Sequence, residues 1–173
     1  SLFNIGGNWT QSGTFNLGTF AEVHFTTAGC NILSNTTLSQ ILVNTGASLT
    51  IGSGVTATSN SHINNSGTIT VSGGTLSASA GYQLTLETAA ATVTVSSGTL
   101  NAGNLWMIAS STLTVSGGTV NFGDNSDTAC NIAGNVVVSS GTLNVGDAVA
   151  TDDIADLNVQ TGGSLSVSGG TVG

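Results

Sequence analysis

Basic residues are absent from this sequence. The 173 residues include no Lys or Arg and eight Asp or Glu, which gives a formal net charge of −8. Nucleic-acid-binding proteins need cations to displace the counterions of the phosphates, and anionic membrane surfaces attract basic segments in the same way. The composition therefore excludes nucleic acid and anionic membrane surfaces as partners.

Proline is also absent, and aromatic residues make up only 5% of the chain. Because proline cannot donate a backbone hydrogen bond, its absence suits strands that pair on both edges. The apolar residues are 39% of the chain and mostly aliphatic, which suits a narrow core better than the thick core of a β-sandwich. The longest apolar runs fall far short of the ~18 residues of a membrane-spanning helix, so we expect no direct membrane insertion.

What the chain has in abundance is one repeated phrase. Its clearest copy, TLTVSGGTVNF at 112–122, alternates aliphatic residues with Thr or Asn on both sides of a Ser-Gly-Gly corner. A period of two places the aliphatic side chains on one face of a strand, and the glycines let the backbone turn. Further copies are TITVSGGTLSA (68–78), TVTVSSGTLNA (92–102), NVVVSSGTLNV (135–145) and SLSVSGGTVG (164–173), with weaker copies in QSGTFNL (11–17) and SLTIGSGV (48–55).

The spacing of the copies indicates a solenoid. The last glycines of successive corners are 20, 24, 20, 23 and 29 residues apart; they are Gly54, Gly74, Gly98, Gly118, Gly141 and Gly170. A period near 20 corresponds to one coil of a repeat array. A third, variable segment would return the chain at 83–86, 105–108 and 130–132. The sequence thus predicts an all-β fold, a single-stranded parallel β-solenoid (β-helix) with coils of about 20–24 residues and roughly three faces.

We expect a single domain over 1–173, with less regular N-terminal coils at 1–36 and regular repeats at 37–173. The chain has a GNWT start, then SGTFN, VHF, LTI and LTVSGGTV in succession. This succession resembles large secreted bacterial repeat proteins of the adhesin and autotransporter-passenger type. The resemblance implies a secreted β-solenoid at the cell surface, and it transfers no catalytic residue and no cofactor to this chain.

The ends of the chain lead to the functional prediction. Terminal coils of a solenoid expose unpaired strand edges unless they are capped, and neither end resembles a cap. Joining them gives SGGTVGSLFNIGG, which continues the repeat, so the predicted assembly ends are Ser1, Leu2, Phe3, Thr171, Val172 and Gly173. We predict an extracellular structural protein that stacks head to tail with copies of itself into a filament or surface fibre. The alternative is the stalk or passenger segment of a cell-surface adhesin, with glycans or a host surface as its partner.

Cys30 and Cys130 lie in the matching phrases GCNILSN and ACNIAGN. If these phrases occupy matching positions four or five coils apart, the sulfurs are on the order of 20 Å from each other, too far for an intrachain disulfide. Two small core residues are the favoured interpretation. An intermolecular disulfide between subunits and metal binding are the alternatives.

Other polar residues offer weaker candidate sites. Loop carboxylates can ligate calcium, and the candidates are Asp124, Asp127, Asp152, Asp153 and Asp156; their spacing does not recur between coils, so solvated loops are the favoured interpretation. His24, His62, Glu22 and Glu87 form no pattern typical of a catalytic site. We therefore expect no enzymatic activity and no cofactor.

Two columns of outward side chains are also predicted. Threonine pairs at 68/70, 92/94 and 112/114 would stack into a double column, which either supports the sheet or, as a less favoured alternative, binds ice. Asparagines recur two residues after the corner glycine-threonine step, at Asn16, Asn101, Asn121 and Asn144. We expect them to hydrogen-bond along the stack as a ladder.

Overall fold

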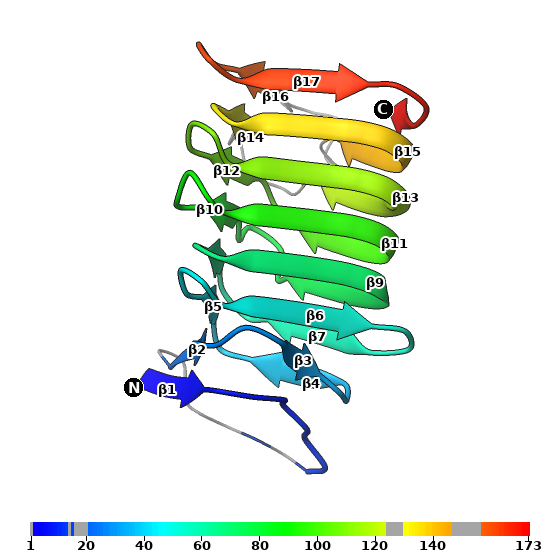
Figure 1. Cartoon of the computed structure of the whole chain (residues 1–173). Coiled ribbons are helices and arrows are strands. Elements are labelled where there is room, and N and C mark those ends of the chain that lie inside the picture. Colours follow the sequence, from blue (N-terminus) through cyan, green and yellow to red (C-terminus); the bar gives the residue numbers. More distant parts are fainter. Residues whose placement is uncertain (1, 14, 16–20, 124–129, 147–156) are drawn as a thin grey trace.

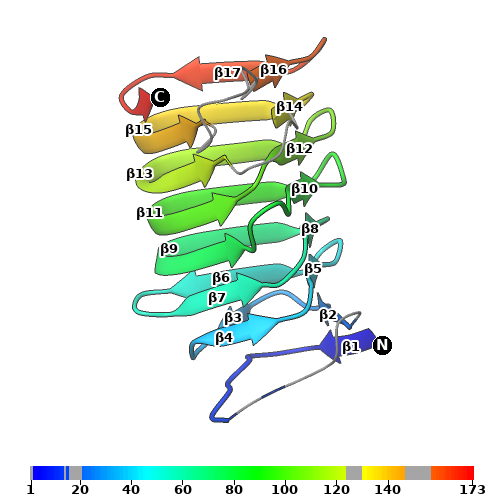
Figure 2. The same ribbon diagram turned by 180° about the vertical axis from the view of Figure 1, so that it is seen from behind.

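The computed structural model describes residues 2–13, 15, 21–123, 130–146 and 157–173. Within these residues the secondary structure is entirely β, and the strands stack as successive coils (Figures 1 and 2). Neighbouring coils pair in parallel throughout. This confirms the predicted parallel β-solenoid.

One side of every coil belongs to an eight-stranded sheet, which we call the short-strand sheet. Its strands, in their order along the stack, are β1 (Leu2–Ile5), β2 (Glu22–Phe25), β5 (Ile41–Val43), β8 (Ile63–Asn65), β10 (Leu84–Leu86), β12 (Leu105–Met107), β14 (Cys130–Ile132) and β16 (Leu157–Val159). Each strand aligns with the next without a register shift. The predicted return segments at 83–86, 105–108 and 130–132 are three of these strands.

The other two sides of each coil belong to the ten-stranded long-strand sheet. It contains β3 (Cys30–Ile32), β4 (Thr36–Leu38), β6 (Ser48–Gly52), β7 (Thr56–Ser59), β9 (Thr68–Ala78), β11 (Thr92–Ala102), β13 (Thr112–Phe122), β15 (Asn135–Val145), β17 (Ser164–Val167) and β18 (Thr171–Val172). The sequence predicted two strands per repeat, whereas β9, β11, β13 and β15 each run through the corner as one bent strand (Figure 1). Register irregularities between neighbouring long strands fall at the Ser-Gly corner.

Glycine is required at the corners because the coils approach closely there. Gly98 has a φ of +81°, and a Cβ at this position would collide with the carbonyl oxygen of Gly74 in the preceding coil. Gly141 has a φ of +80° and would collide in the same way with Gly118. Glycine is needed at these corners because it adopts a positive φ readily and has no Cβ to collide with the neighbouring coil.

The core is a stack of inward-facing aliphatic columns. One column of the short-strand sheet runs through Val23, Ile41, Ile63, Leu84 and Leu105, all of which are buried. The continuous core extends from Trp9 to Leu143 in the sequence. Parallel pairing begins with the first two described strands, β1 and β2, and continues from β2 to β5.

The two cysteines do not occupy matching positions. Cys30 begins β3 in the long-strand sheet, whereas Cys130 begins β14 in the short-strand sheet. The phrase Cys-Asn-Ile fits both places because it satisfies the same in-out-in alternation in either sheet. Both side chains are buried, which supports core residues and opposes an intermolecular disulfide, since a disulfide requires a second sulfur about 2 Å away.

Candidate functional site at the two ends of the stack

Exposed large apolar side chains concentrate at the ends of the solenoid. Apart from Tyr82 and Trp106, those of the described residues lie in the first coils or in the last coil; they are Leu2, Phe3, Leu33, Val159 and Val167. Isolated surface hydrophobics are ordinary, but a group of them on one surface indicates a contact site. The ends of the stack are therefore the candidate functional surfaces.

The N-terminal end is covered by three aromatic rings. Phe3, Trp9 and Phe15 contact one another edge to face, with ring centroids 6.2 Å (Phe3–Trp9), 5.7 Å (Phe3–Phe15) and 4.8 Å (Trp9–Phe15) apart. Trp9 is 8% exposed, whereas Phe3 remains 39% exposed. Trp9 belongs to the core cluster and Phe15 packs against it, whereas Phe3 leaves an apolar surface exposed.

Hydrogen bonds hold Trp9 at the end of the core. Its backbone N–H donates to Asn31 at 2.8 Å, and its carbonyl accepts from the N–H of Leu33 at 2.8 Å. Its indole Nε1 donates to the hydroxyl of buried Thr36 at 3.0 Å, and that hydroxyl also contacts the side-chain oxygen of Gln11. These bonds fix the residues that follow β1 onto β3 and β4.

The C-terminal end has no such aromatic cover among its described residues. The inward-facing Leu157, Leu165 and Val172 are only half-buried, and Val159 and Val167 are 43% and 48% exposed. In the preceding coils the aligned Ile132 and Val138 are fully buried. The last coil thus presents an open layer of the core and the free edges of β16 and β17 (Figures 1 and 2).

The predicted assembly ends coincide only partly with this surface. Leu2 and Phe3 are exposed at one end, as Thr171 and Gly173 are at the other, while Val172 is half-buried; Ser1 lies outside the described residues. Sequence reasoning missed Val159 and Val167, although their inward positions in the last strands could have indicated them. It also missed the role of Trp9, for which the repeat offered no comparable position.

Charged side chains are absent from both terminal segments that the structure describes. Residues 2–13 and 157–173 contain no Asp or Glu. The described acidic residues are Glu22 and Glu87, and the six aspartates lie outside the described residues. Contact between two ends would therefore not bring acidic side chains of these segments together.

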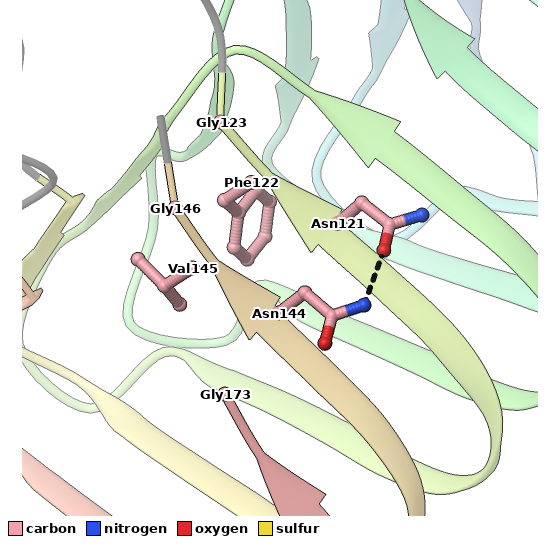
Figure 3. Close-up of a pocket in the computed structure, with 7 residues that line it drawn as sticks. All are labelled: Asn121, Phe122, Gly123, Asn144, Val145, Gly146 and Gly173. Carbon is pink, nitrogen blue, oxygen red and sulfur yellow. Dashed lines mark hydrogen bonds between the residues drawn. The ribbon is translucent and has the colours of Figure 1, made fainter. Parts of the chain in front are cut away.

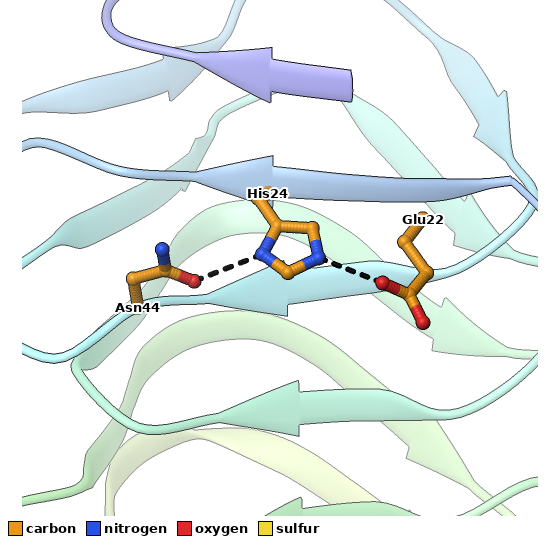
Figure 4. A network of polar contacts seen from close by, with 3 residues as sticks. All are labelled: Glu22, His24 and Asn44. Atoms are coloured by element: carbon orange, nitrogen blue, oxygen red, sulfur yellow. Dashed lines mark hydrogen bonds and ion pairs between the residues drawn. The ribbon is translucent and has the colours of Figure 1, made fainter. Parts of the chain in front are cut away.

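His24 lies in a small polar network on the outer side of β2 (Figure 4). Its Nε2 is 3.0 Å from Oε2 of Glu22 and its Nδ1 is 3.1 Å from Oδ1 of Asn44. Residues two apart in a strand share a face, so the Glu-Val-His spacing could have predicted this pair. Both ring nitrogens are engaged by these oxygens, and the contact with Asn44 links neighbouring coils.

His62 is also engaged by its surroundings. Its Nδ1 accepts from the N–H of Gln83 at 3.2 Å, and its ring contacts Tyr82 edge to face at 5.1 Å. The two histidines therefore lie in separate networks. Among the contacts of the described residues, neither network pairs its histidine ring with a Ser, Cys or Thr nucleophile.

The calcium candidates Asp124, Asp127, Asp152, Asp153 and Asp156 lie outside the described residues. Within the part that the structure describes, no group of three or more His, Cys, Asp or Glu side chains could hold a metal ion. An open groove of about 300 Å³ lies where β13 and β15 end, lined by Phe122, Val145 and three glycines among others (Figure 3). Its lining adjoins segments outside the described residues, so we assign it no ligand.

The outward columns form as predicted. Thr68, Thr92 and Thr112 align, with Ser48 before them and Asn135 after them. The asparagine ladder is confirmed for three members. Asn121 donates to Asn101 at 2.8 Å. Asn144 donates to Asn121 at 2.8 Å, and Figure 3 shows this second bond. Asn16 lies outside the described residues. A column that sequence analysis missed joins Thr56, Thr75, Thr99, Thr119, Thr142 and Thr171.

Comparison of the chain with protein-family models, with curated proteins and with solved structures finds no match. No helix among the described residues is long and apolar enough to span a membrane.

Proposed function

We propose that this chain is an extracellular structural protein whose solenoid stacks head to tail into a filament or surface fibre. The observation that supports the proposal best is the open last coil, in which Val159 and Val167 occupy core positions but remain about half-exposed. A following coil would bury them as Ile132 and Val138 are buried one coil earlier. The other end offers the complementary partner, an edge strand beside a partly exposed aromatic cluster.

Several weak contributions favour the contact. Full burial of an aliphatic side chain stabilises by about 1.5–3 kcal/mol, so each half-exposed valine would add on the order of 1 kcal/mol. Each completed backbone hydrogen bond adds about 0.5–1.5 kcal/mol. A contact that repeats by translation and rotation without closing into a ring produces a fibre.

The second candidate function is the stalk of a cell-surface adhesin. The observation that favours it is the difference between the ends, because the aromatic rings partly cover the first coil whereas the last coil is open. In a stalk, the last coil would be covered by further coils of the same polypeptide. Glycans or a host surface would then be recognised elsewhere in that polypeptide.

Negative-stain electron microscopy of the 173-residue chain over a concentration series separates these functions. The filament proposal predicts uniform fibres one solenoid wide, whose length increases with concentration. Short rods that stay single at every concentration would contradict it and favour the stalk.

A further inference from the structure

The columns of the two sheets suggest how successive subunits would align. One outward column of the short-strand sheet begins at Asn4, continues through His24 and ends with Asn131 and Asn158. The flanking inward columns begin at Phe3 and Ile5 and end at Leu157 and Val159. These columns pass through all eight strands without a register shift.

We propose that β16 of one subunit pairs with β1 of the next in the one register that keeps these columns unbroken. The inference rests on the proposed head-to-tail assembly and adds its alignment. Leu157 then faces Phe3, Asn158 faces Asn4, and Val159 faces Ile5 of the following subunit. A shift by one residue would turn the apolar side chains outward, and a shift by two would leave one of the two inward pairs without a partner.

The long-strand sheet leads independently to a matching alignment. Trp9 pairs with Ile32, and the same inward column ends at Val167. Continuing it places the exposed Val167 beside the aromatic cluster of Phe3, Trp9 and Phe15 of the next subunit. The neighbouring outward column would bring Ser166 beside Asn8 of that subunit.

The side-chain amides of the outward columns donate their hydrogen bonds in one direction along the stack. Asn158 donates to Asn131 at 3.3 Å, and Asn31 donates to Asn8 at 2.9 Å. In both pairs the later coil donates to the earlier one, as it also does in the ladder of Asn101, Asn121 and Asn144. At the junction, Asn4 of the following subunit would donate to Oδ1 of Asn158, so one amide hydrogen bond continues across the boundary.

Disulfide trapping tests this register. The native cysteines are first replaced (C30A/C130A), and N158C and N4C are introduced on separate chains that are mixed and oxidised. Paired residues of adjacent strands are about 4.8 Å apart, within disulfide range. We expect a linked dimer only in the mixture, and a ladder of covalent multimers from the chain that contains both substitutions.

The control pair is N158C with L2C, which lies on the same outer face two residues from Asn4. Its Cα separation would be about 8 Å, beyond the disulfide limit, so its yield should be at least about tenfold lower. S166C with N8C is a second expected pair, on the other sheet. Two outcomes would overturn the register and leave the filament proposal intact. Fibres could form but give neither expected disulfide, or N158C chains could link better to L2C chains than to N4C chains. Absence of fibres from the unsubstituted chain would overturn both.

Discussion

The glycines of this chain allow a test that separates backbone conformation from the close contact between coils. Gly46 has a φ of +78° but open space around its Cα. Gly67 has no positive φ, but a Cβ there would collide with the carbonyl oxygens of Ala47 and Asn44. Gly98 combines both restrictions, and Gly52 has neither. Alanine substitutions at these four glycines therefore test the backbone restriction alone, the contact restriction alone, both together and neither.

The structure predicts the order of their effects. Gly52→Ala should be neutral or stabilise by about 0.5 kcal/mol, because alanine lowers the entropy of the unfolded chain. Gly46→Ala should destabilise by about 1 kcal/mol, because the left-handed backbone disfavours a Cβ. Gly67→Ala should cost about 1–3 kcal/mol through the forced separation of coils. Gly98→Ala should cost the most, about 2–4 kcal/mol if the two effects add.

Urea unfolding followed by far-UV circular dichroism measures these differences. Because long repeat arrays can unfold in stages, amide hydrogen exchange of the substituted coil gives a second, local measure. If Gly67→Ala unfolds no earlier than Gly52→Ala, the carbonyl contact does not limit the approach of the coils, and the reasoning from the stacked corners is refuted.

Three further predictions concern the ends, the ladder and the tryptophans. Val167→Asp should leave the monomer fold unchanged, because Val167 is 48% exposed in the single subunit. It should abolish fibre growth in a sedimentation assay, because stacking would bury an unpaired charge. The matched change Ser166→Asp, on the outer face, should weaken growth less, and equal effects would contradict the orientation of β17. Asn121→Ala should lower the unfolding free energy by about 1 kcal/mol through the loss of two ladder bonds, compared with Thr119→Ala as control, and equal losses would argue against the ladder. Acrylamide should quench the fluorescence of Trp106, which is 45% exposed, much more than that of Trp9, which is 8% exposed. The variant W106F reports on Trp9 and W9F on Trp106. Equal quenching of the two variants would contradict the aromatic cluster.

The regular coils could be predicted from the sequence because local and global requirements agree there. The phrase at 112–122 alternates with a period of two and has glycine at the corner, and the whole phrase is β13. Its repetition at a nearly constant interval then requires stacking, since one coil alone cannot bury its aliphatic residues. The bent strand was not predicted because a Ser-Gly-Gly corner is compatible with both a break in pairing and continued pairing across a bend.

The ends were harder to predict because their residues do not repeat. Trp9 is held by a bond to Thr36, 27 residues later, and no periodic pattern indicates such a contact. The cysteine phrases led to a wrong alignment because three residues with the same alternation fit either sheet. The exposure of Val159 and Val167 depends on which coil is last in the stack, and local sequence does not carry that information.

The most direct test of end-to-end stacking is cryo-electron microscopy of the chain at concentrations that produce fibres. End-to-end stacking predicts strands perpendicular to the fibre axis and a short-strand sheet that continues from β16 of one subunit into β1 of the next, at the usual spacing of about 4.8 Å. Subunits that associate through the threonine faces, or that remain single rods at every concentration, would contradict it.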